Sequence, residues 1–147
     1  MPRNHEWIAR IRDVEREYLG MRQAADRFLS AAHGDPAILL HGLRYREIAV
    51  ASANLEGTYL IRLFAEFESG ARDYWRTIRD TNPRTVDLLT GLAAQRRIPD
   101  LLCDNAQSVR AYRNSWVHDS AEIPDIIPIA VARSYLCHFF SFLPPQW

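Results

Sequence analysis

Residues 54–80 read NLEGTYLIRLFAEFESGARDYWRTIRD, and their apolar positions recur at helical spacing throughout. One side of the predicted helix carries Leu55, Tyr59, Leu63, Phe67, Ala71, Tyr74 and Ile78. Leu60, Phe64 and Trp75 broaden that apolar side. A helix with so wide an apolar face belongs at the centre of a core. The stretch therefore predicts a central helix that ends before Asn82 and Pro83.

The chain before this stretch predicts a long first helix. Its apolar residues alternate at intervals of four and three, as in a coiled coil: Trp7, Ile11, Val14, Tyr18, Met21, Ala25, Phe28 and Ala32. Gly34, Asp35 and Pro36 end this helix. Residues 36–53 are less regular and predict one or two short helices, with an interruption at His41 and Gly42.

Three further helices are expected after the central one. The first covers about residues 85–97 with Val86, Leu89, Leu92 and Ala93 inward. The second begins at Pro99, ends around His118 and buries Leu101, Leu102, Ala106, Val109, Tyr112 and Trp116. The last begins at Pro128, buries Ile129, Ala132, Leu136, Phe139 and Leu143, and stops before Pro144. No run alternates like a strand, so residues 1–147 predict one all-α domain, a bundle of about five or six helices.

Composition limits the function. The chain has 147 residues and a formal net charge of zero, which argues against a general high-affinity DNA coat. All 18 basic residues are arginine. A coding bias explains this count, although arginine also binds phosphate in a bidentate manner that lysine does not match. Only particular arginines can therefore support a function.

Several features predict a reduced, cytoplasmic protein without a membrane anchor. Cys103 and Cys137 lack metal-ligand spacing and lie in apolar helical patterns, so we expect buried free thiols. The first residues lack the apolar core of a signal peptide, and the apolar run 135–143 is too short to span a bilayer.

The candidate functional residues lie in the stretch Tyr112–Asp119, which reads YRNSWVHD. It places Arg113, Asn114 and His118 near the end of a predicted helix. Intervals of four put Arg110, Asn114 and His118 on one helical face, with Arg113 on its flank. Guanidinium, carboxamide and imidazole are the groups that RNA cleavage without a metal requires.

Spacing alone is weak evidence for such a site. With 18 arginines and 5 histidines, chance gives roughly 0.6 matches to an arginine followed five residues later by histidine. A second match, Arg133 and His138, lies in an apolar helix, where His138 is expected in or just below the core. Two structural alternatives also stand for the candidate stretch. Arg113 can pair with Asp104 or Asp119, and His118 can cap its helix.

These residues resemble the signature of the HEPN superfamily, helical domains of prokaryotic toxins, defence systems and eukaryotic ribonucleases. The signature is an arginine, four to six residues and a histidine, often with a polar residue after the arginine, which Arg113, Asn114 and His118 match. The resemblance implies that the site lies at the end of a late helix and that residues 54–80 form the family's core helix. Many toxins of this family have a tyrosine two residues after the histidine, which a nucleotidyltransferase modifies. Here that position is Ser120.

The expected function is a metal-independent endoribonuclease of HEPN type without a cofactor. His118 transfers protons, since imidazole titrates near neutrality, and Arg113 offsets transition-state charge. Asn114 either orients His118 or binds a phosphate oxygen, and Arg110 contacts a flanking phosphate. The chemistry needs both an acid and a base, so we expect a homodimer that acts on RNA.

The resemblance also implies possible partners, an antitoxin or a nucleotidyltransferase-type protein. The alternative function is a non-catalytic module that binds nucleotides or other proteins. Trp7, Trp75 and Trp147 are candidates for such an interface, although core packing is expected for the first two.

Overall fold

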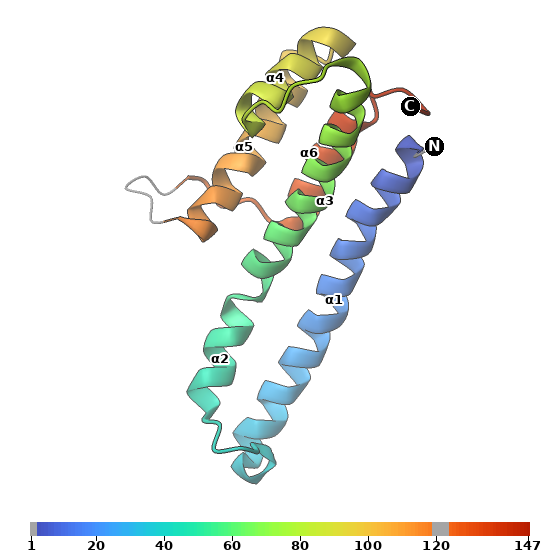
Figure 1. Cartoon of the computed structure of the whole chain (residues 1–147). Helices are drawn as coiled ribbons and strands as arrows, with labels where there is room; N and C mark the ends of the chain where they lie inside the picture. The colour runs from blue at the N-terminus through green and yellow to red at the C-terminus, as the bar shows by residue number, and fades with distance from the viewer. Residues whose placement is uncertain (1–2, 119–123) are drawn as a thin grey trace.

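A computed structural model describes residues 3–118 and 124–147, and within these ranges the protein is all-α (Figure 1). The elements are α1 (Asn4–Gly34), the short 3-10 helix η1 (Pro36–Ile38), α2 (Tyr45–Ala53), α3 (Leu55–Ile78), α4 (Thr85–Arg96), α5 (Asp100–Val117) and α6 (Ile129–Phe140). The described residues contain no strand, and an isolated antiparallel bridge joins Arg3 to Gln146. The predicted helical bundle is therefore confirmed.

The length of α1 determines the elongated shape of the molecule. Its 31 residues span about 47 Å, whereas the 24 residues of α3 span about 36 Å. The remaining length of α1 lies beside α2, and both α2 and α3 run back along it (Figure 1). A turn precedes α2, and in it His41 and Gly42 have φ of 59° and 70°, the left-handed backbone that glycine favours. The predicted interruption at these two residues is thus confirmed.

The core surrounds α3, which packs against α1, α4, α5 and α6. Phe67 lies at its centre and is fully buried. Its ring centroid is 5.6 Å from those of Phe64 and Phe139 and 6.1 Å from that of Phe140. Such tilted and edge-to-face contacts add to the stabilisation from burial. The prediction that residues 54–80 form the central helix is confirmed.

The two ends of the described chain are held together at one end of the molecule (Figure 1). The Asn4 side-chain amide donates to the carbonyls of Phe140 and Leu143, at 3.1 and 2.9 Å. The Asn4 backbone N–H donates to the Pro145 carbonyl at 3.0 Å. These bonds fix the start of α1 against the chain that follows α6.

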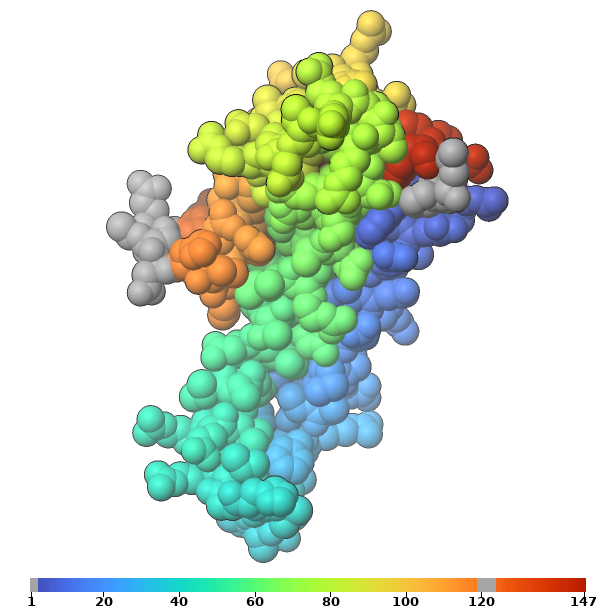
Figure 2. All heavy atoms as spheres, viewed as in Figure 1, coloured from blue at the N-terminus to red at the C-terminus, as the bar shows by residue number. Residues whose placement is uncertain are grey.

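The opposite end of the molecule has little core. Figure 2 shows α1 and α2 projecting beyond the wider body formed by α3 to α6. The side chains of Met21 and Phe28, predicted to face inward, are 46% and 39% exposed. The partly buried positions of this part of α1 are instead Arg22, Ala25 and Leu29, so the covered face passes beside Met21 and Phe28.

Other predicted positions also differ in burial. Leu101 is 69% exposed because it lies in the first turn of α5, which its neighbours leave open. His138 is exposed, since Leu136, Cys137, Phe139 and Phe140 fill the buried side of α6. Trp147, a candidate interface residue under the alternative function, is partly buried against the core.

The two cysteines are free thiols, as predicted. Cys137 is buried, but Cys103 is only partly buried. Burial raises the pKa of both thiols above the ordinary value, which disfavours the reactive thiolate.

Candidate functional site

His118 lies where α5 ends, and its side chain is exposed to solvent. Its backbone N–H donates to the Asn114 carbonyl at 2.9 Å and thereby closes the last turn. The residue itself has φ −126° and ψ 143°, which is extended backbone. Helical spacing therefore does not set the direction of its imidazole. The predicted alignment of Arg110, Asn114 and His118 on one helical face does not extend to His118.

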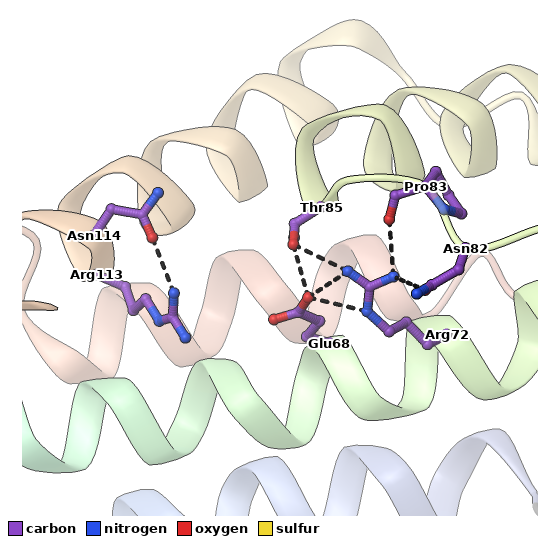
Figure 3. A network of polar contacts seen from close by, with 7 residues as sticks. All are labelled: Glu68, Arg72, Asn82, Pro83, Thr85, Arg113 and Asn114. Carbon is purple, nitrogen blue, oxygen red and sulfur yellow. Dashed lines mark hydrogen bonds and ion pairs between the residues drawn. The ribbon is translucent and has the colours of Figure 1, made fainter. Parts of the chain in front are cut away.

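Arg113 points toward α3 rather than along the solvent flank of α5. Its guanidinium carbon lies 5.7 Å from the ring centroid of Phe64, and its Nε is buried without a hydrogen-bond partner in the described residues. Its Nη1 donates to the Asn114 side-chain oxygen at 3.0 Å (Figure 3). The predicted position of Arg113 beside Asn114 therefore faces α3, where the long arginine side chain lies against the aromatic residue of that helix.

Of the four predicted site residues, the structure joins only Arg113 and Asn114 directly. The Arg110 Nε donates to the Gln107 side-chain oxygen at 2.7 Å, one turn earlier on α5. Among the described residues, no hydrogen bond links the imidazole of His118 to Arg110, Arg113 or Asn114. The site is thus a hydrogen-bonded arginine–amide pair with an exposed imidazole four residues beyond it.

The proposed structural alternatives have different outcomes. In the described residues, Arg113 forms no ion pair with Asp104. Asp119 and Ser120 lie outside the described residues. His118 does occupy the C-terminal capping position of α5, and the capping hydrogen bond comes from its backbone N–H.

A polar network that the sequence reasoning missed lies on α3 near Arg113 (Figure 3). The Glu68 Oε1 accepts bonds from the Arg72 Nε and Nη2 at 3.0 and 2.7 Å and from the Thr85 hydroxyl at 2.7 Å. Arg72 also donates to the Asn82 side chain and the Pro83 carbonyl, both at 2.9 Å. The network joins the end of α3 to the start of α4.

The charge of Glu68 is stabilised by its neighbours. Burial by itself raises the pKa of this carboxyl, but the hydrogen bonds from Thr85 and Arg72 and the charges of Arg72 and Arg113 together lower it below the ordinary value. Glu68 is therefore an anion within the electrostatic reach of the Arg113 guanidinium. The spacing of four between Glu68 and Arg72 was the available sequence signal.

A second missed carboxylate positions the chain after the site. The Glu56 Oε1 accepts from the Ile129 backbone N–H at 2.8 Å, at the first residue of α6. A carboxylate at a helix N-terminus accepts a hydrogen bond from a backbone N–H that has no partner within the helix. Its negative charge is also stabilised by the positive end of the helix dipole. This contact joins α3 and α6 over a separation of 73 residues, so no local sequence pattern indicated it.

The aromatic residues of α5 also differ from the prediction. Val109 is fully buried and Tyr112 packs against the core, as expected. Trp116, expected to anchor the helix, is 41% exposed. Its ring lies over Gly57 of α3 at the outer end of the α3–α5 contact.

Other site types find no support in the described part of the chain. No group of three or more His, Cys, Asp or Glu side chains there is arranged to hold a metal ion. None of the described helices combines the length and apolar character needed to cross a bilayer. Comparison with protein-family models, curated proteins and solved structures finds no match to this chain.

Proposed function

We propose that this protein is a metal-independent endoribonuclease of HEPN type, with toxin- or defence-like activity and a site shared by two copies of the chain. The observation that supports this most is the solvent-exposed His118 on the helix that carries the hydrogen-bonded pair Arg113 and Asn114. An exposed imidazole can exchange protons with a substrate, and a guanidinium held by a neighbouring amide is oriented before phosphate binds.

In the proposed reaction, the RNA 2′-oxygen attacks the adjacent phosphorus and the bond from phosphorus to the 5′-oxygen breaks. One His118 accepts the proton of the 2′-hydroxyl as the new bond forms. The His118 of a second copy gives a proton to the departing 5′-oxygen. The products are a 2′,3′-cyclic phosphate and a free 5′-hydroxyl.

Arg113 stabilises the charge that develops on the phosphate in this reaction. Asn114 uses one of the five N–H donors of the guanidinium, so Nη donors are left for phosphate oxygens. The positive charge of Arg113 contributes to the lowered pKa of Glu68 on α3, so the two side chains attract each other. Arg110 supplies a further positive charge one turn earlier on α5.

The second copy supplies the second imidazole, since α5 and its capping residue contain one histidine, His118. Exposed apolar side chains at the end of α5, in the segment before α6 and on α6 are available for association. Val117, Ile126 and Val131 are 44%, 77% and 38% exposed. Burying them against their symmetry equivalents would form a twofold interface beside His118.

The test replaces His118 with alanine and measures cleavage of a mixed RNA pool in the presence of a chelator. Loss of proton transfer is expected to lower the rate by about 10²- to 10⁴-fold. His138→Ala is the matched control, because Arg133 and His138 have the same spacing and His138 is also exposed. Circular dichroism checks that both variants fold. Equal cleavage by the two variants, or loss of wild-type cleavage on chelation, would contradict the proposal.

The dimer is tested separately by sedimentation of the 17.0 kDa chain. We expect a species of twice that mass, and Ile126→Asp should shift it toward the monomer and reduce cleavage with it. A wild-type chain that cleaves RNA as a strict monomer would remove the shared-site mechanism.

A non-catalytic protein-interaction module is the second candidate, favoured by the apolar surface at the α1–α2 end. Leu40, Leu43 and Val50 are 64%, 44% and 54% exposed there. In this case the wild-type chain cleaves no RNA at any concentration, and Leu40→Ser with Leu43→Ser alters its association state. Cleavage that depends on His118 and is unaffected by these substitutions supports the nuclease instead.

A further inference from the structure

Trp116 is unusual among the four tryptophans of this chain. Trp75 is buried, and Trp7 and Trp147 pack against the core. Trp116 leaves 41% of its surface exposed, two residues before His118. Because a tryptophan side chain buries a large apolar area when it is covered, this exposure leaves a substantial apolar surface in water beside the proposed site.

The indole of Trp116 is held in place by α3 and by its own helix. A Cβ built on Gly57 would lie 2.5 Å from Cδ2 and Cε3 and 2.7 Å from Cε2. Nearly equal distances to three fused-ring atoms mean that the face of the indole lies against the Gly57 backbone. The Tyr112 ring contacts it from one turn earlier, with centroids 6.4 Å apart and planes at 76°. One face of the indole is covered, so the exposure belongs to the opposite face and the edges.

Trp116 and Arg113 are neighbours on the same side of α5. Side chains three residues apart on a helix have Cβ atoms about 5–6 Å apart. Both point toward α3, where Arg113 lies at Phe64 and Trp116 at Gly57, two turns away along that helix. The indole and the guanidinium thus lie three residues apart on one side of α5 and contact α3 at points two turns apart.

We propose that Trp116 binds a nucleobase of single-stranded RNA by stacking, next to the phosphate that Arg113 holds. This inference rests on the proposed nuclease function and assigns the binding of the substrate's base to a specific residue. A base must be unpaired and unstacked to lie on an aromatic face, so the site selects single strands over duplexes. The Gly57 side of the indole is closed, so each copy of the site takes one base.

The binding test uses a short RNA whose riboses are 2′-O-methylated, because such a strand has no 2′-hydroxyl to attack and stays intact. Titration should quench tryptophan fluorescence in the wild type, and Trp116→Phe should remove that quenching. Trp116→Ala should weaken binding about 5- to 150-fold, the usual contribution of one stacked base. An oligonucleotide with an abasic residue at the bound position should lose affinity for the wild type but not for Trp116→Ala.

Trp147→Phe is the control for changes in fluorescence alone, because Trp147 packs on the core and lies outside the site. It should leave RNA affinity unchanged. The proposal is overturned if Trp116→Ala binds the methylated strand as tightly as the wild type, or if the wild type does not bind it. A further result would also overturn it. In that case the fluorescence emission of Trp116 shifts as the protein concentration rises without RNA, and added RNA then causes no quenching. That result would make a second copy of the chain the occupant.

Base stacking by Trp116 and RNA cleavage by His118 can be measured independently. Stacking is measured on a strand that cannot be cleaved, so His118→Ala should keep the quenching while losing cleavage. A wild type that stacks bases but cleaves nothing retains the binding role of Trp116 and loses the catalytic role of His118. Cleavage that is unchanged by Trp116→Ala, together with unchanged affinity, removes the stacking role alone.

Discussion

Individual residues determine how α5 is placed on α3. Gly57 has no side chain, and this lets the Trp116 indole lie directly on the α3 backbone. Arg113 then lies two α3 turns further on, against Phe64. A glycine in a helix interior lowers stability by about 1 kcal/mol relative to alanine. At position 57 the close approach of the tryptophan explains why glycine is there.

Gly57→Ala is therefore expected to destabilise the protein despite the better helix propensity of alanine. The new methyl would meet the indole at 2.5 Å, so the ring must move, at a cost of about 1–3 kcal/mol. Chemical denaturation followed by circular dichroism measures this change. Gly20→Ala on α1 is the matched control, since no heavy atom lies within 4 Å of its added Cβ. We expect that variant to gain up to about 1 kcal/mol, and a similar gain at position 57 would contradict the described packing.

At the scale of helices, the Glu68 network connects α3 to the start of α4. The carboxylate accepts from Arg72 on its own helix and from Thr85, the first residue of α4. Arg72 in turn holds the Asn82 side chain and the Pro83 carbonyl in the connecting segment. The network thus fixes the turn through which the chain reverses before α4.

Glu68→Gln should destabilise the folded protein by about 1–2 kcal/mol near neutral pH, because bonds to a charged acceptor become bonds to a neutral one. The folded pKa of Glu68 is lower than the ordinary value of 4.5, so the stabilisation is present above that value. It is lost as the pH falls from about 4.5 through the folded pKa. The difference in unfolding free energy between wild type and variant should therefore shrink in acid.

Urea denaturation at a series of pH values measures this difference. Glu17→Gln is the control, because Glu17 forms an exposed pair with Arg62, worth less than about 1 kcal/mol. A Glu68→Gln variant as stable as wild type at neutral pH, or a difference that grows in acid, would exclude the stabilising role of the network.

At the scale of the whole molecule, stability is unevenly distributed. The phenylalanines of α3 and α6 pack in the wide body, where Phe64, Phe67, Phe139 and Phe140 are fully buried. The projecting end has no such cluster. Within η1 no residue is buried, and within α2 only Ser52 is. Local opening requires less free energy where few apolar contacts are lost.

Hydrogen exchange should therefore be faster in α2 and η1 than in α3 and α6. Mass spectrometry of peptides covering residues 36–53 and 60–75 compares them in one sample. We expect exchange of the first peptide by local opening and of the second only on global unfolding. Equal protection of both peptides in the free monomer would refute this distribution. Protection of residues 36–53 that appears only at high protein concentration would show that a second copy covers them.

The sequence alone was sufficient to predict where the main helices lie along the chain. Periodic apolar residues identified the central helix, and proline, glycine and asparagine marked where helices begin and end. It also placed Arg113, Asn114 and His118 at the end of α5, because that depends only on local spacing. These features are local, and a helix forms its backbone hydrogen bonds within itself.

Tertiary structure decided which apolar faces are covered and where the polar side chains point. The apolar stripe of α1 is continuous in sequence, but Phe28 is exposed whereas the adjacent Leu29 is partly covered. The Arg113 side chain lies against Phe64 of α3 with the Glu68 charge in reach, and the Trp116 indole lies on Gly57. Those partners are 45 to 59 residues away along the chain. Periodicity shows that a face is apolar, but only the packing of distant helices decides what covers it.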